Sequence, residues 1–281
     1  MRGPRGVHSV AAMRQTTKII LGALAALTLI VPTANAAVQD VQVTLDQQNA
    51  RVEGLSGYGW AALTLNAPRD VYYSIVRLKP GKDTTAFANK AQRMSPTAME
   101  SWGATIAAGN ASKGLPYKTT VDLAPGQYEI VVFEGEGKKA QQYVAGGFGV
   151  RDVLAAGPPT EPEATATIGL RDFRFTGPTT LPATGGLKIV NEGEQLHEVV
   201  VTKVKGKMSD AVKAAKAGKF NQIKFASPPS QLIGIVSGGT TNVVEPKLAP
   251  GQYLMLCAYG DKNSRNKPHA ALGMVETITV R

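Results

Sequence analysis

Apolar and polar positions alternate along the chain in many brief stretches, and turn residues separate one stretch from the next. In the second half this pattern predicts six strands, the first of them broken near Arg171 and Asp172. These strands are expected over residues 167–175, 187–190, 198–204, 240–245, 253–257 and 275–280. Pairs such as Gly177-Pro178 and Gly238-Gly239 mark the turns between them. Many short strands at regular spacing indicate a β-sandwich.

One short helix interrupts the strands of the second half. It is expected over residues 209–217, with Ser209 as the N-cap and Gly218 as the stop. The first half has the same outline, with a helix near residues 84–94, a break at Pro96 and a helical turn near residues 98–102. We therefore expect an all-β protein of two tandem Greek-key β-sandwiches, each with a short helical insertion.

The two halves also share a sequence motif. Leu-Ala-Pro-Gly-Gln-Tyr occurs at residues 123–128 and again at residues 248–253, an offset of 125 positions. The same offset aligns the two helical stretches, which argues for a duplicated domain. A Pro-rich stretch over residues 155–164 separates the halves, so the predicted domains are residues 37–154 and 165–281.

The N-terminus is typical of a secretory signal peptide over residues 1–36. Arg14 and Lys18 precede an apolar run at residues 19–31, and Ala-Asn-Ala at residues 34–36 forms a small-x-small cleavage site. The apolar run is too short for a comfortable membrane span, although an uncleaved anchor is the alternative. The protein is therefore expected to be exported, into the periplasm or out of the cell, with no stable membrane insertion after cleavage.

The net charge narrows the choice of partners. The full chain carries a formal charge of +10, and loss of the leader removes four basic residues, which leaves about +6. This modest excess lacks the dense basic stripe of a nucleic-acid binder. It fits an exported protein that meets acidic partner proteins.

Cysteine and histidine are scarce, and their positions are informative. The chain has one cysteine and three histidines, and His8 falls in the expected leader. The remaining set is His197, Cys257 and His269, followed by Met274. A thiolate, two imidazoles and a weak thioether are the ligands of a blue-copper site. A buried, inert core cysteine is the alternative for Cys257.

The strings around these residues resemble the cupredoxin family. The likeness covers residues 165–281 and is carried by three features: a His after an Asn-x-Gly strand end, a Pro-Gly-x-Tyr-x-x-x-Cys strand, and a Pro-His-x-x-x-Gly-Met loop. The chain is especially similar to exported bacterial cupredoxin-like domains in which Glu follows the first ligand, as Glu198 does here. The resemblance implies a mononuclear copper site for one-electron transfer, with His197, Cys257 and His269 as ligands and Met274 as the axial contact.

Two local features differ from better-known members of that family. Eleven residues separate Cys257 from His269, and residues 260–267 among them are expected to form a polar hairpin. We expect His269 to lie near the surface within a basic rim formed by Lys262, Arg265 and Lys267, which would steer an acidic redox partner. Glu198 stands where better-known members often have Asn.

The first half is expected to have the fold without the site. At the offset of 125, the four ligand positions correspond to Tyr72, Val132, Val144 and Gly149. The sequence also lacks the extra histidines of a multicopper oxidase or nitrite reductase, so no enzyme activity is expected. Zinc at the same residues, a metal-free binding or envelope module, and copper storage or delivery remain alternatives.

Overall fold

The computed structural model describes residues 38–135, 140–155, 160–226 and 231–281, and the described residues belong to one compact unit. The expected signal peptide, residues 1–36, lies outside the described residues. Among the described residues, no helix is long and apolar enough to cross a membrane. The first half consists of eight strands and two short helices: β1 (Gln39–Asp46), β2 (Asn49–Glu53), β3 (Gly59–Asn66), β4 (Val71–Leu78), α1 (Thr84–Ala91), α2 (Pro96–Met99), β5 (Gly103–Ala111), β6 (Tyr117–Leu123), β7 (Gly126–Glu134) and β8 (Gln141–Val150).

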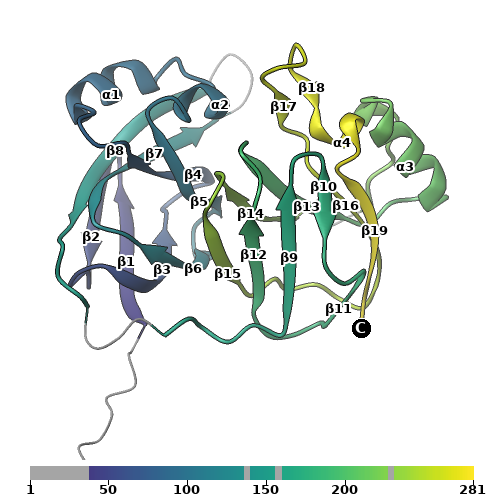
Figure 1. Cartoon of the computed structure of the whole chain (residues 1–281), viewed down its shortest axis with the longest axis horizontal. Coiled ribbons are helices and arrows are strands. Elements are labelled where there is room, and N and C mark those ends of the chain that lie inside the picture. Colours follow the sequence, from purple (N-terminus) through teal and green to yellow (C-terminus); the bar gives the residue numbers. More distant parts are fainter. Residues whose placement is uncertain (1–37, 136–139, 156–159, 227–230) are drawn as a thin grey trace, which may run out of the picture. The chain divides into compact units, whose positions relative to one another are not determined.

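The second half follows a similar order of elements, with one more short strand near its start and with a hairpin and a short helix before its last strand (Figure 1). Its elements are β9 (Ala166–Arg171), β10 (Arg174–Thr176), β11 (Thr180–Leu181), β12 (Leu187–Asn191), β13 (His197–Thr202), α3 (Met208–Lys216), η2 (Phe220–Gln222), β14 (Gln231–Val236), β15 (Thr241–Val244), β16 (Gly251–Leu256), β17 (Gly260–Asp261), β18 (Lys267–Pro268), α4 (His269–Leu272) and β19 (Val275–Val280).

The halves are joined by a shared sheet. Eight strands from both halves form one sheet in the order β10-β9-β12-β15-β6-β3-β1-β2. β15 and β6 make the junction as an antiparallel pair in which Val243 lies opposite Thr120. The opposite layer consists of β5-β4-β7-β8 in the first half and β11-β19-β16-β13-β14 in the second. At the edges of these two sheets, Ser237 N–H donates to the Thr105 carbonyl and Thr105 N–H donates to Ser237 Oγ, each at 2.9 Å.

Each half encloses its own hydrophobic core between the two layers. Along β3 every second residue is buried, the period that places one face of a strand on a core. The first core includes Val41, Leu63 and Ile130. The second core includes Ile189 and Val199, and it also contains Cys257 and Met274. The all-β fold class predicted from the sequence is confirmed.

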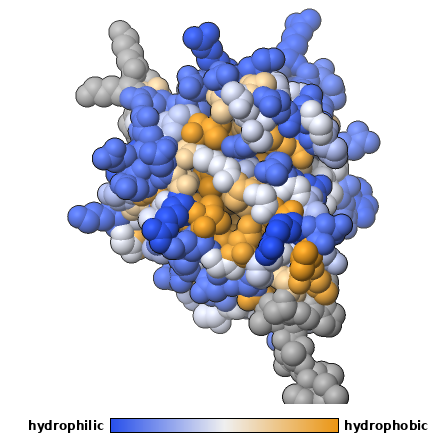
Figure 2. Space-filling view, turned by 90° about the vertical axis from the view of Figure 1, so that its left-hand side faces the viewer, coloured by the Kyte–Doolittle hydropathy of each residue, from blue (hydrophilic) through white to orange (hydrophobic). Residues whose placement is uncertain are grey.

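The outer surface of the first half has an apolar centre with a polar margin (Figure 2). Val52 on β2 and Phe148 on β8 are partly buried hydrophobic residues that pack against the first core. The ring of Phe148 stacks on Tyr128 with a centroid separation of 5.0 Å. This stacked pair joins neighbouring strands of one sheet, since Tyr128 on β7 lies opposite Phe148 on β8.

The shared hexapeptide forms the same turn in both halves. Tyr128 Oη donates to the Ala124 carbonyl at 2.6 Å, and Tyr253 Oη donates to the Ala249 carbonyl at 2.7 Å. Each tyrosine lies two residues into a strand that begins at a glycine with a positive φ. A buried tyrosine that bonds back to the backbone fixes the entry into β7 and into β16 alike.

Several element boundaries differ from those predicted. The helix expected to start after Ser209 begins at Met208, and its N-cap position, Lys207, makes no side-chain cap bond. Met208 packs against the cluster around Leu254, so packing of an apolar side chain decides where the helix begins. The strand expected to reach residue 204 ends at Thr202. Strand β14, which contains Gly234 and lacks a clear alternation, was not predicted.

Candidate metal centre

The predicted ligands come from two paired strands and the loop beyond them. His197 is the first residue of β13, and Cys257 directly follows β16. These strands pair antiparallel, with Val200 opposite Leu256, so the beginning of one lies beside the end of the other. His269 opens α4, the short helix between the hairpin β17–β18 and β19. The fold therefore brings three of the four predicted residues to one end of the sandwich.

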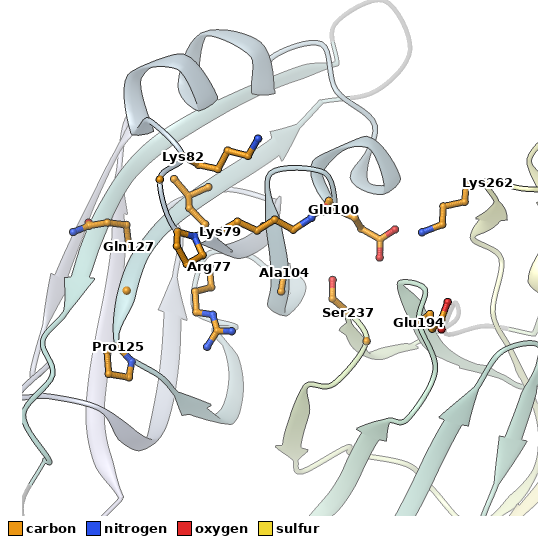
Figure 3. A pocket seen from close by; sticks show the side chains of 16 residues that line it. Arg77, Lys79, Lys82, Glu100, Ala104, Pro125, Gln127, Glu194, Ser237 and Lys262 are labelled. Carbon is orange, nitrogen blue, oxygen red and sulfur yellow. Dashed lines mark hydrogen bonds between the residues drawn. The ribbon is translucent and has the colours of Figure 1, made fainter.

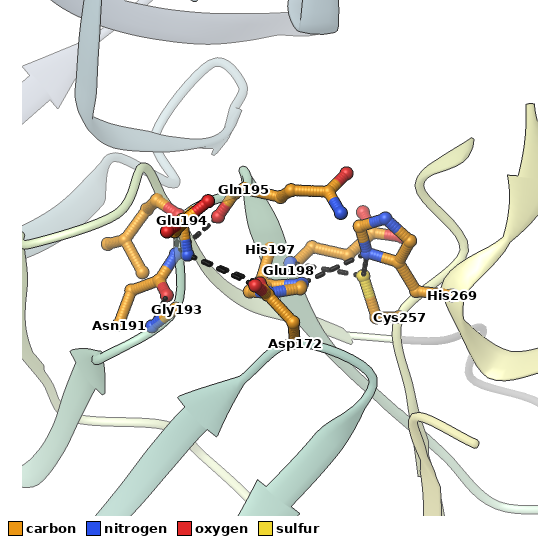
Figure 4. Close-up of polar contacts among 10 residues, drawn as sticks. Asp172, Asn191, Gly193, Glu194, Gln195, His197, Glu198, Cys257 and His269 are labelled. Carbon is orange, nitrogen blue, oxygen red and sulfur yellow. Dashed lines mark hydrogen bonds and ion pairs between the residues drawn. The ribbon is translucent and has the colours of Figure 1, made fainter. Parts of the chain in front are cut away.

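The donor atoms of these three residues converge (Figure 4). His197 Nδ1 and His269 Nδ1 are 3.0 Å apart, and His269 Nδ1 is 3.4 Å from Cys257 Sγ. One ligand atom from each residue lies within 4.8 Å of the others. Metal–nitrogen and metal–sulfur bonds of about 2.0–2.3 Å at trigonal angles would separate the donors by roughly 3.5 Å. The three atoms thus stand at the spacing of ligands around one ion.

Both imidazoles are held neutral, the form that binds a metal. Burial lowers the pKa of His197, although the neighbouring Asp172 carboxylate opposes the shift. Burial, followed by the proximity of His197, lowers the pKa of His269 to about 4. A neutral imidazole has one nitrogen with a free lone pair. Both rings can therefore offer Nδ1 to a cation at neutral pH.

The thiol of Cys257, unlike the two imidazoles, must lose a proton to bind a metal. Burial, with Glu198 nearby, raises the pKa of Cys257 well above its usual value, so the thiol stays protonated unless a cation replaces the proton. A metal ion deprotonates a coordinating thiol outright. The backbone N–H of Glu198 donates to Cys257 Sγ at 3.4 Å, an interaction that favours the sulfur anion. The donor set therefore fits a soft or borderline transition metal.

Asp172 is a site residue that sequence analysis did not identify. It lies in the turn between β9 and β10, where the following residue, Phe173, has a φ of 66°. Asp172 Oδ1 is 3.1 Å from His197 Nε2 and also accepts the backbone N–H of Glu194 at 3.2 Å. A carboxylate on the outer nitrogen places the proton there and points the other nitrogen toward a metal. The only hint in the sequence was the strand break at this point.

A buried asparagine shapes the loop before His197. The Asn191 side-chain amide donates to the carbonyls of Gln195 at 2.7 Å and Val236 at 2.8 Å. Its Oδ1 accepts the backbone N–H of Gly193 at 2.9 Å. These bonds hold the five residues before His197 in a fixed turn, because breaking any of them would leave a buried polar group unpaired.

Met274 lies close to the triad along the backbone. Its N–H donates to the His269 carbonyl at 2.9 Å, and its carbonyl accepts the N–H of Cys257 at 3.1 Å. The side chain is fully buried in the core that also contains Cys257. The position is compatible with a long axial contact, and the role of Met274 as a ligand stays a prediction.

The expectation that His269 lies near the surface is wrong, because its side chain is 0 % exposed. The hairpin forms as predicted, with Asp261 on β17 opposite Lys267 on β18. His269 follows it directly, and its backbone N–H donates to the Tyr259 carbonyl at 2.7 Å. The Phe173 ring adds an edge contact to the imidazole at 5.2 Å. Lys262, Arg265 and Lys267 are exposed on the hairpin as expected, but they do not surround an exposed histidine.

Glu198 is built into the site rather than pointed into solvent. Its carboxylate accepts the N–H of Ala258 at 2.7 Å, and burial raises its pKa to about 7. Tyr259 and Tyr72 lie next to this carboxylate, and burial raises the pKa of both phenols. Because Tyr72 belongs to the first half, the first half contributes part of the surroundings of the site. Within the described ranges, His197, Cys257 and His269 are the one group of three potential metal ligands.

A separate cleft of about 670 Å³ lies where β4, α2 and the loops after β12 and β14 approach one another (Figure 3). Its lining includes the cations of Arg77, Lys79 and Lys262 and the carboxylates of Glu100 and Glu194. One of these charges is already engaged with the protein, since Lys79 Nζ donates to the Glu100 carbonyl at 2.8 Å. Among the described residues that line it, none is one of the predicted ligands.

Comparison with known proteins gives similarity only at the level of solved structures. No family model matches the chain, and no curated protein matches it. The chain is similar to auracyanin A, a "blue" copper protein from Chloroflexus aurantiacus, at 23% identity over 41% of this chain and 96% of that chain, with a TM-score of 0.26. Auracyanin from Roseiflexus castenholzii is 20% identical over 42% of this chain and 99% of that chain, with a TM-score of 0.26.

A longer similarity spans both halves. McoA multicopper oxidase from Aquifex aeolicus is 11% identical over 87% of this chain and 66% of that chain, with a TM-score of 0.27. The chain's own strands and side chains define its architecture more directly. It has an all-β fold of two joined halves with a His–Cys–His triad at one end of its second half.

Proposed function

We propose that the protein binds one copper ion through His197, Cys257 and His269, with Met274 as a weak axial ligand, and that it transfers single electrons. The observation that carries this proposal is the convergence of two neutral Nδ1 atoms and one thiol within 4.8 Å. Bound copper would supply the Cu(I)/Cu(II) couple. A buried triad, held by Asp172 and Asn191, keeps its shape when the charge of the ion changes, which favours rapid electron transfer.

The protein residues have distinct parts in this function. Asp172 keeps the proton of His197 on Nε2, and the Glu198 N–H stabilises the sulfur of Cys257. Phe173 and the hairpin shield His269 from bulk solvent. No residues remain for a second, catalytic copper centre, since the chain contains only three histidines. We therefore propose an electron carrier and not an oxidase.

Localisation and partner follow from the sequence. Signal cleavage after Ala36 would release the protein outside the cytoplasm, in the periplasm or beyond the cell. The exposed cations of the hairpin would attract an acidic redox partner. Burial of His269 favours copper storage or delivery as a second candidate, because it removes the direct imidazole edge through which electrons would leave.

An absorption titration of the protein from Ala37 onward with Cu(II) tests the site. We expect an intense visible thiolate-to-copper band that saturates at one equivalent, and no such band in Cys257→Ser. The matched control is Val132→Ser, which buries a hydroxyl at the corresponding position of the first half and should leave the band unchanged. A band that survives in Cys257→Ser would refute the ligand assignment.

The same titration separates the alternatives. Absence of a band in the wild-type protein, with no rise in melting temperature on adding copper or zinc, would favour the metal-free binding module. A strong band with slow electron exchange toward small redox mediators would favour storage or delivery.

A further inference from the structure

The hairpin β17–β18 is a local insertion that lies against one of the metal ligands. It occupies most of the eleven residues between Cys257 and His269. Most of its residues are exposed, but Asp261 is only 1 % exposed. A buried carboxylate in an otherwise exposed polar hairpin needs a partner, because an unpaired buried charge is costly.

Three buried polar atoms near the hairpin have no hydrogen-bond partner among the described residues. They are His269 Nε2, Asp261 Oδ1 and Gln195 Oε1. Their residues are 0 %, 1 % and 5 % exposed. An unpaired buried polar atom destabilises the folded protein, so three in one region indicate a missing common partner.

The three side chains lie close to one another. Asp261 pairs with Lys267, two residues before His269, and His269 N–H is bound to Tyr259, two residues before Asp261. Figure 4 shows the Gln195 amide extending toward the His269 imidazole. Burial opposes ionisation of Asp261, but the side chains of Ser264 and Gln195, together with His269, hold its pKa below the usual value. Gln195 and His269 are therefore both close neighbours of the Asp261 carboxylate.

The hydrogen-bonding capacities of the three atoms are complementary to one water molecule. With Nδ1 directed at the metal position, the neutral His269 ring carries its proton on Nε2 and donates from it. Asp261 Oδ1 and Gln195 Oε1 can only accept. A water molecule accepts one bond and donates two, and buried waters typically make about three hydrogen bonds. One water would satisfy all three atoms.

We propose that Asp261 and Gln195 are positioning residues that hold the outer nitrogen of His269 through one buried water molecule. The insertion hairpin thereby orients a metal ligand. The arrangement complements the other imidazole, since Asp172 lies directly on His197 Nε2 at 3.1 Å. Each imidazole of the triad then has its own carboxylate, one in direct contact and one through water, which raises the basicity of both ligands.

The first test needs no metal. A high-resolution crystal structure of the metal-free protein should contain an ordered water within about 3.2 Å of His269 Nε2, Asp261 and Gln195. Absence of this water, or a direct hydrogen bond between Asp261 and His269, would contradict the proposed water bridge. Because this measurement does not depend on copper, it separates failure of the bridge from failure of the proposed metal site.

The second test rests on the proposed copper site and uses matched variants. Asp261→Asn keeps the size of the side chain and removes its charge, and Gln195→Met removes the amide. We expect Asp261→Asn to bind Cu(II) about 10–100-fold more weakly and to have a higher reduction potential, because loss of a negative charge favours the reduced ion. Gln195→Met should also bind more weakly, without the loss of charge.

The control is Asn263→Ala, which changes an exposed side chain on the same hairpin. It should leave both affinity and potential unchanged. The potential is informative because a merely structural change in the hairpin would alter stability without a directed shift in potential. Wild-type affinity and potential in folded Asp261→Asn would overturn the proposal.

Discussion

The two halves have very different residues at corresponding positions of their corresponding strands. At the offset of 125, His197 at the start of β13 corresponds to Tyr72 in β4, and Cys257 after β16 corresponds to Val132 in β7. Val132 is fully buried in the first core, as Cys257 is in the second. The cysteine position is therefore a core position of the scaffold, and its side chain can become a ligand only when neighbouring side chains supply a metal environment.

The difference extends to the surroundings of those positions. In the second half a turn carboxylate, Asp172, and a buried amide, Asn191, organise the end of the sandwich. The described residues of the first half include neither an insertion hairpin nor a histidine at the corresponding end, and Tyr72 packs edge-on against Phe133 at 5.3 Å. The first half therefore shows what the fold needs for stability, and the second half shows what is added for a site.

The largest expected change in stability comes from substituting a buried acid of the first half, Glu129. Glu129 is 6 % exposed, and burial raises its pKa from 4.5 to about 7. An acid whose folded-state pKa is raised reduces stability as pH rises from about 4.5 to 7. We expect Glu129→Gln to be more stable than the wild type at pH 8, by up to about 3 kcal/mol, and equally stable at pH 4.

Urea unfolding of the metal-free protein at both pH values measures this effect. The control is Glu134→Gln on the same strand, since Glu134 accepts a charge-assisted bond from Arg69 Nε at 2.6 Å. Removing that charge should not stabilise the protein at either pH. Equal stability of Glu129→Gln and the wild type at pH 8 would show that Glu129 is not a strained buried acid.

The next largest effect is expected from Asp172, the turn carboxylate that contacts a predicted ligand in the second half. Asp172→Asn keeps the shape of the side chain but can place the wrong tautomer on His197. We expect Cu(II) affinity to fall about 10–100-fold, with the fold intact. Competition with a chelator of known affinity measures the change, and Glu192→Gln, at an exposed ion pair with Arg171, is the neighbouring control. Unchanged affinity in Asp172→Asn would contradict the positioning role.

The smallest effect should be the same in both halves. Tyr128→Phe and Tyr253→Phe each remove one phenol bond to a backbone carbonyl, at Ala124 and Ala249. Each should lower the free energy of unfolding by about 1 kcal/mol, and neither should alter copper binding. Thermal unfolding of the two single variants and the double variant checks this. A large difference in stability between the two single variants would show that the two turns are not equivalent.

Much of the architecture follows from local pattern. Strand β19 matches its predicted bounds, and its residues from Thr277 to Val280 alternate between polar and apolar types. The repeated hexapeptide indicated a duplication, and it forms the same turn in both halves. Pairing of β6 with β15 could not be foreseen, since it joins residues such as Thr120 and Val243 that are far apart in sequence. Local periodicity carries no information about which distant edge a strand will meet.

The candidate site shows the same division. His197, Cys257 and His269 were identified because their residue types are rare in the chain and suited to a metal. Asp172 was missed because aspartate is common in turns, and only the three-dimensional contact with His197 distinguishes it. Burial of His269 was also missed, because a polar hairpin gives no sign in sequence of which side chain it will cover.

The shared eight-stranded sheet also bears on how the protein avoids self-association. Strand β15 contains Val243 and Val244, and β6 covers its outer backbone groups. An open strand edge is a template on which other chains can add. Each half therefore acts as a built-in cap for the other, and a second half detached from the first would expose a ready site for strand addition. Fusion of the two sandwiches protects solubility, whether or not the first half ever takes part in redox chemistry.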